Sequence, residues 1–209
     1  MEEPFETGEV EGVLHRPESP NGHVIALTHG AGSDCQAALL TRLAQAFESS
    51  GYTVLRYNLP YRRQRPKGLP YPAGAARDRA GIAHAAEAAR KLAFGRLFLG
   101  GHSYGGRQSA MVAAEHSVIA NALVLLSYPL HPPKDPSNKR TAFFPELRTP
   151  ALFVHGTSDP FGSLEELREA MALIPARTDL LAVEGARHDL SRAAGQAGEI
   201  LERLEALGG

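Results

Sequence analysis

Several features that mark specialised classes of protein are scarce or missing in this sequence. One cysteine, Cys35, stands among 209 residues, so the chain cannot close a disulfide within itself, and this favours a reducing, intracellular setting. No apolar run approaches the length that a membrane-spanning helix needs. The acidic first residues, Met-Glu-Glu-Pro-Phe-Glu, lack the basic and apolar regions of a secretory signal. We therefore expect a cytoplasmic protein that does not bind membranes.

An excess of one charge is also missing. The 22 Lys and Arg residues balance 23 Asp and Glu residues, for a formal net charge of -1, which removes the basic surface expected of a general nucleic-acid binder. With 43% hydrophobic and 22% charged residues, the composition is typical of a globular domain that buries a core without disulfides. We predict one domain over residues 1–209, as a monomer or a homodimer.

What the chain does contain is an alternation of short apolar runs with longer Ala-rich stretches. The runs are apolar nearly throughout, as in parallel strands covered on both faces, and they lie at residues 24–28, 53–57, 96–99, 122–126, 151–154 and 179–183. The stretches between them predict helices at residues 36–50, 73–93, 104–116, 164–173 and 190–207, with Gly51 ending the first. This alternation predicts an α/β fold, three-layer α/β/α, with a mainly parallel, doubly wound central sheet. Residues 9–15 are predicted to add an antiparallel edge strand.

Two irregular segments, residues 60–72 and 128–150, each follow a predicted strand. In a parallel sheet both then lie along the carboxyl edge, where ligands bind. The second segment is too short for a multi-helix lid, which predicts a minimal lid and an open cleft.

A strand, a sharp turn and a helix are predicted around Ser103. The sequence from residue 99 reads Leu-Gly-Gly-His-Ser-Tyr-Gly-Gly, which places Gly101 and Gly105 two residues before and after the serine. A nucleophile on such a turn has a strained backbone crowded by neighbouring chain, and glycines relieve that crowding. The alternative is a turn that only packs tightly or holds a phosphate on helix-terminal N–H groups.

A serine nucleophile needs a base, and the base needs a carboxylate that orients it. Asp159 and His188 follow the last two predicted strands, so both fall at the carboxyl edge in the chain order Ser, Asp, His. We predict a catalytic triad of Ser103, Asp159 and His188. The alternatives are an N-cap role for Asp159, a loop or capping role for His188, and Asp135 or Asp189 as the acid.

Acyl transfer also needs two N–H donors aimed at the developing oxyanion. We predict the backbone N–H groups of Tyr104, directly after the nucleophile, and of Ala31, in the loop after the strand at residues 24–28. Glycines on both sides of Ala31 allow close approach of the backbone, although they also fit a simple tight turn.

The elbow and the order of the triad resemble the α/β-hydrolase superfamily, the serine hydrolases that include esterases, lipases and dienelactone hydrolases. Motifs at residues 28–32, 56–61, 100–107 and 128–133 are similar to a lidless, mostly uncharacterised bacterial subgroup, which is related to a testis-expressed protein and a histone-acetyltransferase complex subunit. Side chains within these motifs are the candidates for substrate binding: His29, Tyr61, His102 and His131.

The resemblance implies a serine hydrolase acting on a small ester, thioester or related acyl substrate, with no metal or organic cofactor. The alternative is a catalytically silent interaction scaffold on the same fold. Basic side chains on the two irregular segments suggest either a cationic rim that favours acidic substrates or ordinary solvated charge: Arg62, Arg63, Arg65, Lys67, His131, Lys139 and Arg140. Cys35, near a predicted helix start, is either a thiol of lowered pKa or a small core residue.

Overall fold

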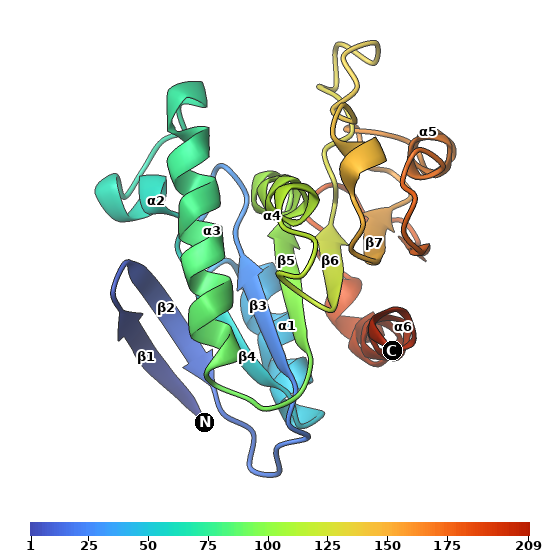
Figure 1. The fold of residues 1–209 in the computed structure, drawn as a ribbon. Coiled ribbons are helices and arrows are strands. Elements are labelled where there is room, and N and C mark those ends of the chain that lie inside the picture. Colours follow the sequence, from blue (N-terminus) through green and yellow to red (C-terminus); the bar gives the residue numbers. More distant parts are fainter.

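Six parallel strands form the centre of the protein, and the computed structural model describes all 209 residues. These strands are β3 (Val24–Thr28), β4 (Thr53–Tyr57), β5 (Leu97–His102), β6 (Ala122–Leu126), β7 (Ala151–Gly156) and β8 (Thr178–Val183). They are joined by an antiparallel pair, β1 (Glu2–Thr7) and β2 (Val10–His15), in the order β1-β2-β4-β3-β5-β6-β7-β8. The arrowheads of β3, β5, β6 and β7 point to the same end in Figure 1, so their following loops share one edge.

Helices cover both faces of this sheet (Figure 1). One core packs α3 (Ala75–Arg90), α4 (Tyr104–Glu115) and α5 (Leu164–Met171) against the first face, and a second packs α1 (Ala38–Ser49) and α6 (Ala197–Gly208) against the other. The predicted three-layer α/β/α arrangement is therefore confirmed. None of the helices combines the length and the apolar character needed to cross a membrane.

The central strands were predictable because every residue of β3, β4 and β6 is buried, so the apolar runs match the strands from end to end. β5 and β7 run further than predicted, since His102, Gly156 and the glycines before Ser103 continue the ladder to neighbouring strands. Gly51 has a positive φ of 89° just after α1, as predicted for a residue that ends a helix.

The prediction that residues 9–15 form the edge of the sheet was wrong. β2 occupies that stretch, but β1 pairs outside it and forms the edge itself. β1 was not predicted, because most of its side chains are exposed and polar and the strand therefore has no apolar run. Pro4 within this strand is tolerated only at such an edge position.

The last predicted helix also begins later than expected. Leu190 adopts a positive φ of 47°, which no right-handed helix accommodates, and a short 3-10 helix at Ala193–Gln196 precedes α6. Within the first irregular segment, α2 (Pro60–Gln64) begins at a proline whose missing N–H costs a helix start nothing. A second 3-10 turn follows at Pro72–Gly74. Residues 128–150 contain only the 3-10 turn Phe144–Glu146, so no multi-helix lid is present.

Candidate active site

Ser103 stands on the sharp turn between β5 and α4. Its backbone has φ 50° and ψ -113°, a strained region for a residue with a side chain, and its N–H donates to the Leu126 carbonyl at 2.8 Å. The flanking glycines are required by contact, because a Cβ on Gly101 would lie 2.3 Å from the Thr28 oxygen and one on Gly105 2.5 Å from the His29 oxygen. The crowding predicted for this turn is therefore confirmed.

The loop after β8 brings His188 to Ser103. Its Nε2 lies 2.8 Å from Ser103 Oγ, although 85 residues separate the two in the chain. Phe161 stacks on the His188 ring with centroids 4.1 Å apart, and His102 Nε2 donates to the His188 carbonyl at 2.7 Å. These two contacts hold the face of the His188 ring and the backbone of the same residue.

Asp159, in the loop after β7, faces the other ring nitrogen. Its Oδ2 and Oδ1 accept from His188 Nδ1 at 2.8 and 3.0 Å, and Oδ1 also accepts from the Phe161 N–H at 2.9 Å. Burial alone would raise the pKa of Asp159, but the hydrogen bond and charge of His188 outweigh it, so the pKa lies below its usual range. A carboxylate held in this way orients the ring with Nδ1 protonated and Nε2 free to accept.

The alternative roles for this aspartate and the alternative acids do not match the geometry. Ser163, not Asp159, caps α5, through a reciprocal pair of hydrogen bonds with Glu166. Asp135 accepts instead from the Ser137 hydroxyl, and Asp189 from the Ser191 N–H. Of the acids considered, Asp159 is the one that contacts the His188 ring.

The two predicted oxyanion donors have free N–H groups. Tyr104 is the first residue of α4, where the backbone N–H has no acceptor within the helix. The Ala31 N–H donates to no backbone carbonyl. Both residues line one cleft of about 430 Å³ beside the Ser103 turn. Both predicted donors are therefore unsatisfied and lie beside the Ser103 turn, and their role as an oxyanion hole stays a prediction.

Buried side chains hold the loop that carries Ala31 in place through hydrogen bonds. The Tyr61 hydroxyl lies 2.8 Å from the Ala31 carbonyl oxygen, and Arg62 Nε donates to the Ser33 carbonyl at 2.8 Å. His29 is fully buried and accepts from the Leu59 N–H through Nε2 at 3.1 Å, while Nδ1 lies 2.9 Å from the Gly30 oxygen. Burial lowers the pKa of His29 to about 4, so the ring is neutral. These contacts fix the loop geometry.

Three of the four side chains predicted to bind substrate are buried and bonded within the fold. His29 and Tyr61 are hydrogen-bonded to the loop that carries Ala31, so they hold its shape. His131 is 4% exposed, and its Nε2 lies 3.5 Å from Glu166 at the start of α5. These three side chains thus have contacts within the fold, and a role for them in substrate binding stays a prediction. His102 is half-buried between the Ala31 loop and His188, and is the one of the four that lies beside the candidate nucleophile.

The predicted cationic rim does not form as such. Arg62 is 6% exposed and donates to backbone carbonyls, because burial of a guanidinium requires acceptors for its N–H groups. Arg63 bonds to the β1–β2 hairpin, and Lys139 pairs with Glu169. Arg65 lies over the Tyr71 ring. Most of these charges therefore have partners within the fold, and Arg140 and Lys67 are without a carboxylate or aromatic partner.

Sequence reasoning missed Asp78 and Arg107. Asp78, on α3, is 1% exposed and accepts from the Tyr104 hydroxyl at 2.8 Å and from the Tyr61 N–H at 3.1 Å. Burial raises its pKa above the usual range. Arg107 lines the cleft one helical turn after Ser103, and its N–H donates to the Ser103 carbonyl at 2.9 Å. The four-residue spacing between Ser103 and Arg107 along a predicted helix could have indicated Arg107, whereas no pattern in the sequence indicates Asp78.

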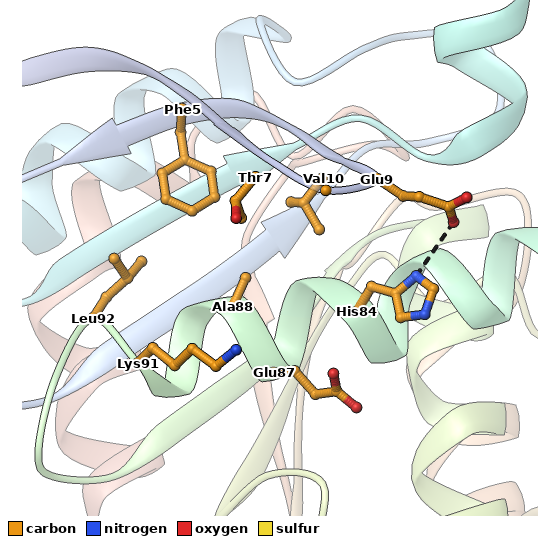
Figure 2. Close-up of a pocket in the computed structure, with 10 residues that line it drawn as sticks. Phe5, Thr7, Glu9, Val10, His84, Glu87, Ala88, Lys91 and Leu92 are labelled. Carbon is orange, nitrogen blue, oxygen red and sulfur yellow. Dashed lines mark ion pairs between the residues drawn. The ribbon is translucent and has the colours of Figure 1, made fainter.

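Other features lie apart from this site. Cys35 is 4% exposed, and burial raises the pKa of its thiol to about 11, which makes it a small core residue. No group of three or more His, Cys, Asp or Glu side chains is arranged to hold a metal ion. A separate groove of about 470 Å³ lies between the β1–β2 hairpin and α3, where Glu9 pairs with His84 (Figure 2). None of the residues of the candidate active site lines this groove.

Comparisons with known proteins agree with this architecture. The family model described as an alpha/beta hydrolase domain matches residues 21–205. The fold is similar to an alpha-beta serine hydrolase homologue from Coxiella burnetii, with 18% identity over 98% of this chain and 95% of that one and a TM-score of 0.73. It is also similar to a dienelactone hydrolase from Anabaena variabilis, with 19% identity over 99% and 96% of the two chains and a TM-score of 0.73. A serine hydrolase without a lid from Xanthomonas campestris gives 17% identity over 97% and 94%, with a TM-score of 0.71.

Proposed function

Because the chain belongs to the alpha/beta hydrolase domain family, we propose that it is a serine hydrolase that cleaves a small ester, thioester or related acyl substrate through an acyl-enzyme. One observation carries the proposal, the hydrogen-bonded row from Ser103 Oγ through the His188 ring to the Asp159 carboxylate. A packing role alone does not account for a strained serine aligned in this way with a buried, ionised acid.

In the first half-reaction, Ser103 Oγ attacks the carbonyl carbon of the substrate while its proton passes to His188 Nε2. The electron pair of the carbonyl bond moves to oxygen, and the N–H groups of Ala31 and Tyr104 bind that oxyanion. Collapse re-forms the carbonyl and expels the alcohol or thiol, which takes the proton from Nε2. The product of this step is an ester between the acyl group and Ser103.

In the second half-reaction, water takes the place of the leaving group. His188 Nε2 removes a proton from it as the water oxygen attacks the acyl carbon, and the same two N–H groups bind the second oxyanion. Ser103 Oγ then leaves with the proton from His188, which releases the carboxylic acid and restores the starting state. Asp159 stays ionised throughout and stabilises the imidazolium.

Labelling with a fluorophosphonate tests the proposal, since this reagent reacts with an activated serine. We expect covalent modification at Ser103, found by mass spectrometry of peptides, and none in Ser103→Ala. His188→Ala is expected to slow ester turnover on the order of 10⁴-fold, and Asp159→Asn by as much or less. Ser137→Ala, at an exposed serine whose hydroxyl donates to Asp135, is the matched control and keeps full labelling. An unlabelled wild-type chain would instead favour the interaction scaffold.

A further inference from the structure

The cleft beside Ser103 lies on the acyl side of the proposed reaction. Ala31 and Tyr104 line it, whereas neither Ser103 nor His188 does. His188 hands its proton to the leaving group, so a substrate whose leaving group faces His188 would extend its acyl chain from the oxyanion donors toward this cleft. The volume of about 430 Å³ suits a short acyl chain, and Leu69, Tyr71 and Met111 give it an apolar wall.

One charged group in this cleft has no counter-charge. Arg107 forms no ion pair with a carboxylate, and its Nε is buried without a hydrogen-bond partner. The other arginine of the cleft, Arg79, is satisfied by Gln108 at 3.3 Å and Glu115 at 3.5 Å. The chain itself therefore supplies no acceptor for this N–H, and a guanidinium that lines a cleft without a counter-charge favours an anion bound there.

A second guanidinium, on Arg140, lies near Arg107 but does not line the cleft. Arg140 is half-buried, and it is bonded to the Pro129 carbonyl rather than to a carboxylate. Burial and the nearby charge of Arg107 lower its pKa, and the buried Tyr128 phenol lies near both side chains. Two like charges in a partly desolvated place repel each other, and an anion placed near them removes that cost.

We propose that the cleft binds an acyl group that carries its own carboxylate, which pairs with Arg107, so that the substrate is a half-ester of a short dicarboxylic acid. The proposal rests on the hydrolase function proposed above and names the substrate class for it. A planar carboxylate matches the guanidinium fork in two parallel hydrogen bonds. A phosphate dianion would seek several further donors, and the free backbone N–H groups here are committed to the oxyanion.

The test compares monomethyl glutarate with its neutral isostere, in which a carboxamide replaces the free carboxylate, by the rate of methanol release. We expect the wild type to show a higher kcat/KM for the anionic ester, by about 10-fold or more, and Arg107→Gln to lower that ratio by about 10-fold to 100-fold. Arg107→Lys keeps part of the preference, since the charge stays but the fork is lost. Arg148→Gln is the matched control, because this exposed arginine lies before β7, at the opposite edge of the sheet.

A binding measurement separates failure of this inference from failure of the proposed function. In the Ser103→Ala background, calorimetry should detect monomethyl glutarate, and adding Arg107→Gln should weaken its binding by about 10-fold or more. If Ser103 is labelled by a fluorophosphonate but Arg107→Gln leaves the preference and the binding unchanged, the carboxylate site is wrong and the hydrolase stands. If Ser103 is not labelled, the hydrolase is wrong, and the calorimetry still decides whether Arg107 binds the anion.

Discussion

Acid should destabilise the fold through His29, the ring that holds the candidate oxyanion loop. The His29 side chain accepts the Leu59 N–H through Nε2, and burial lowers its pKa from 6.5 to about 4. In the unfolded chain the ring returns to its ordinary pKa, so between these two values the unfolded state binds more protons than the folded state. Stability is therefore complete above about pH 6.5 and falls as the pH drops toward 4.

The size of the effect follows from the two pKa values. The full shift corresponds to about 3 kcal/mol, and at pH 5 about 2 kcal/mol of it is already lost. Since a domain is stable by about 5–15 kcal/mol in total, one ring accounts for a measurable share. Other buried groups also titrate, so the contribution of His29 must be isolated by comparing the wild type with a variant.

Urea unfolding of the wild type and of His29→Gln, at pH 7.5 and at pH 5, isolates the contribution of His29 to stability. A glutamine amide oxygen can replace Nε2 as the acceptor of the Leu59 N–H and does not titrate. The variant loses the contact between Nδ1 and the Gly30 oxygen, so we expect it to be less stable than the wild type at pH 7.5. We expect that difference in unfolding free energy to shrink by about 2 kcal/mol at pH 5. His116→Gln, at an exposed position after α4, is the matched histidine control. A His29→Gln difference that does not change with pH would refute the reasoning.

Two further substitutions probe contacts described above. Gly105→Ala should lower the free energy of unfolding by about 1–3 kcal/mol and reduce kcat, because its Cβ would lie 2.5 Å from the His29 carbonyl oxygen. Gly32→Ala should be tolerated, because a Cβ there meets nothing within 4 Å. Thermal unfolding and ester turnover of both variants test this prediction. Ser163→Ala should lower the free energy of unfolding by about 1 kcal/mol, because it removes the cap that Ser163 and Glu166 make at the start of α5. The urea midpoint measures this loss, and an unchanged midpoint would contradict the capping role.

The accuracy of the sequence prediction varies with how each element is buried. β3, β4 and β6 are buried on both faces, so the ends of their apolar runs in the sequence mark the ends of the strands. β1 has no such run, because its position is set by pairing with β2 over Glu2–Thr7 rather than by its own burial. The start of α6 depends on the unusual φ of Leu190, which the sequence pattern does not show.

The same distinction applies to the candidate site. Ser103, Asp159 and His188 each follow a buried strand of one parallel sheet, so their meeting at one edge could be predicted, and the structure brings them within hydrogen-bond distance. Their catalytic roles stay a prediction for the labelling experiment. The partners of Arg62 and Asp78 depend on how α2 and α3 pack, which a single sequence does not reveal. The contacts of His29 and Tyr61 with the loop that carries Ala31 likewise depend on packing and could not be predicted from the sequence.

The buried thiol of Cys35 makes this chain convenient for attaching probes. Only the thiolate reacts with maleimides and related reagents, and a pKa of about 11 leaves about one thiolate in 3,000 at pH 7.5, before its 4% exposure is considered. A cysteine introduced at an exposed position would therefore take up a fluorophore alone, with the native residue left in place. Leu69, which is 66% exposed and lines the cleft beside Ser103, would put that fluorophore where a bound acyl group changes its surroundings.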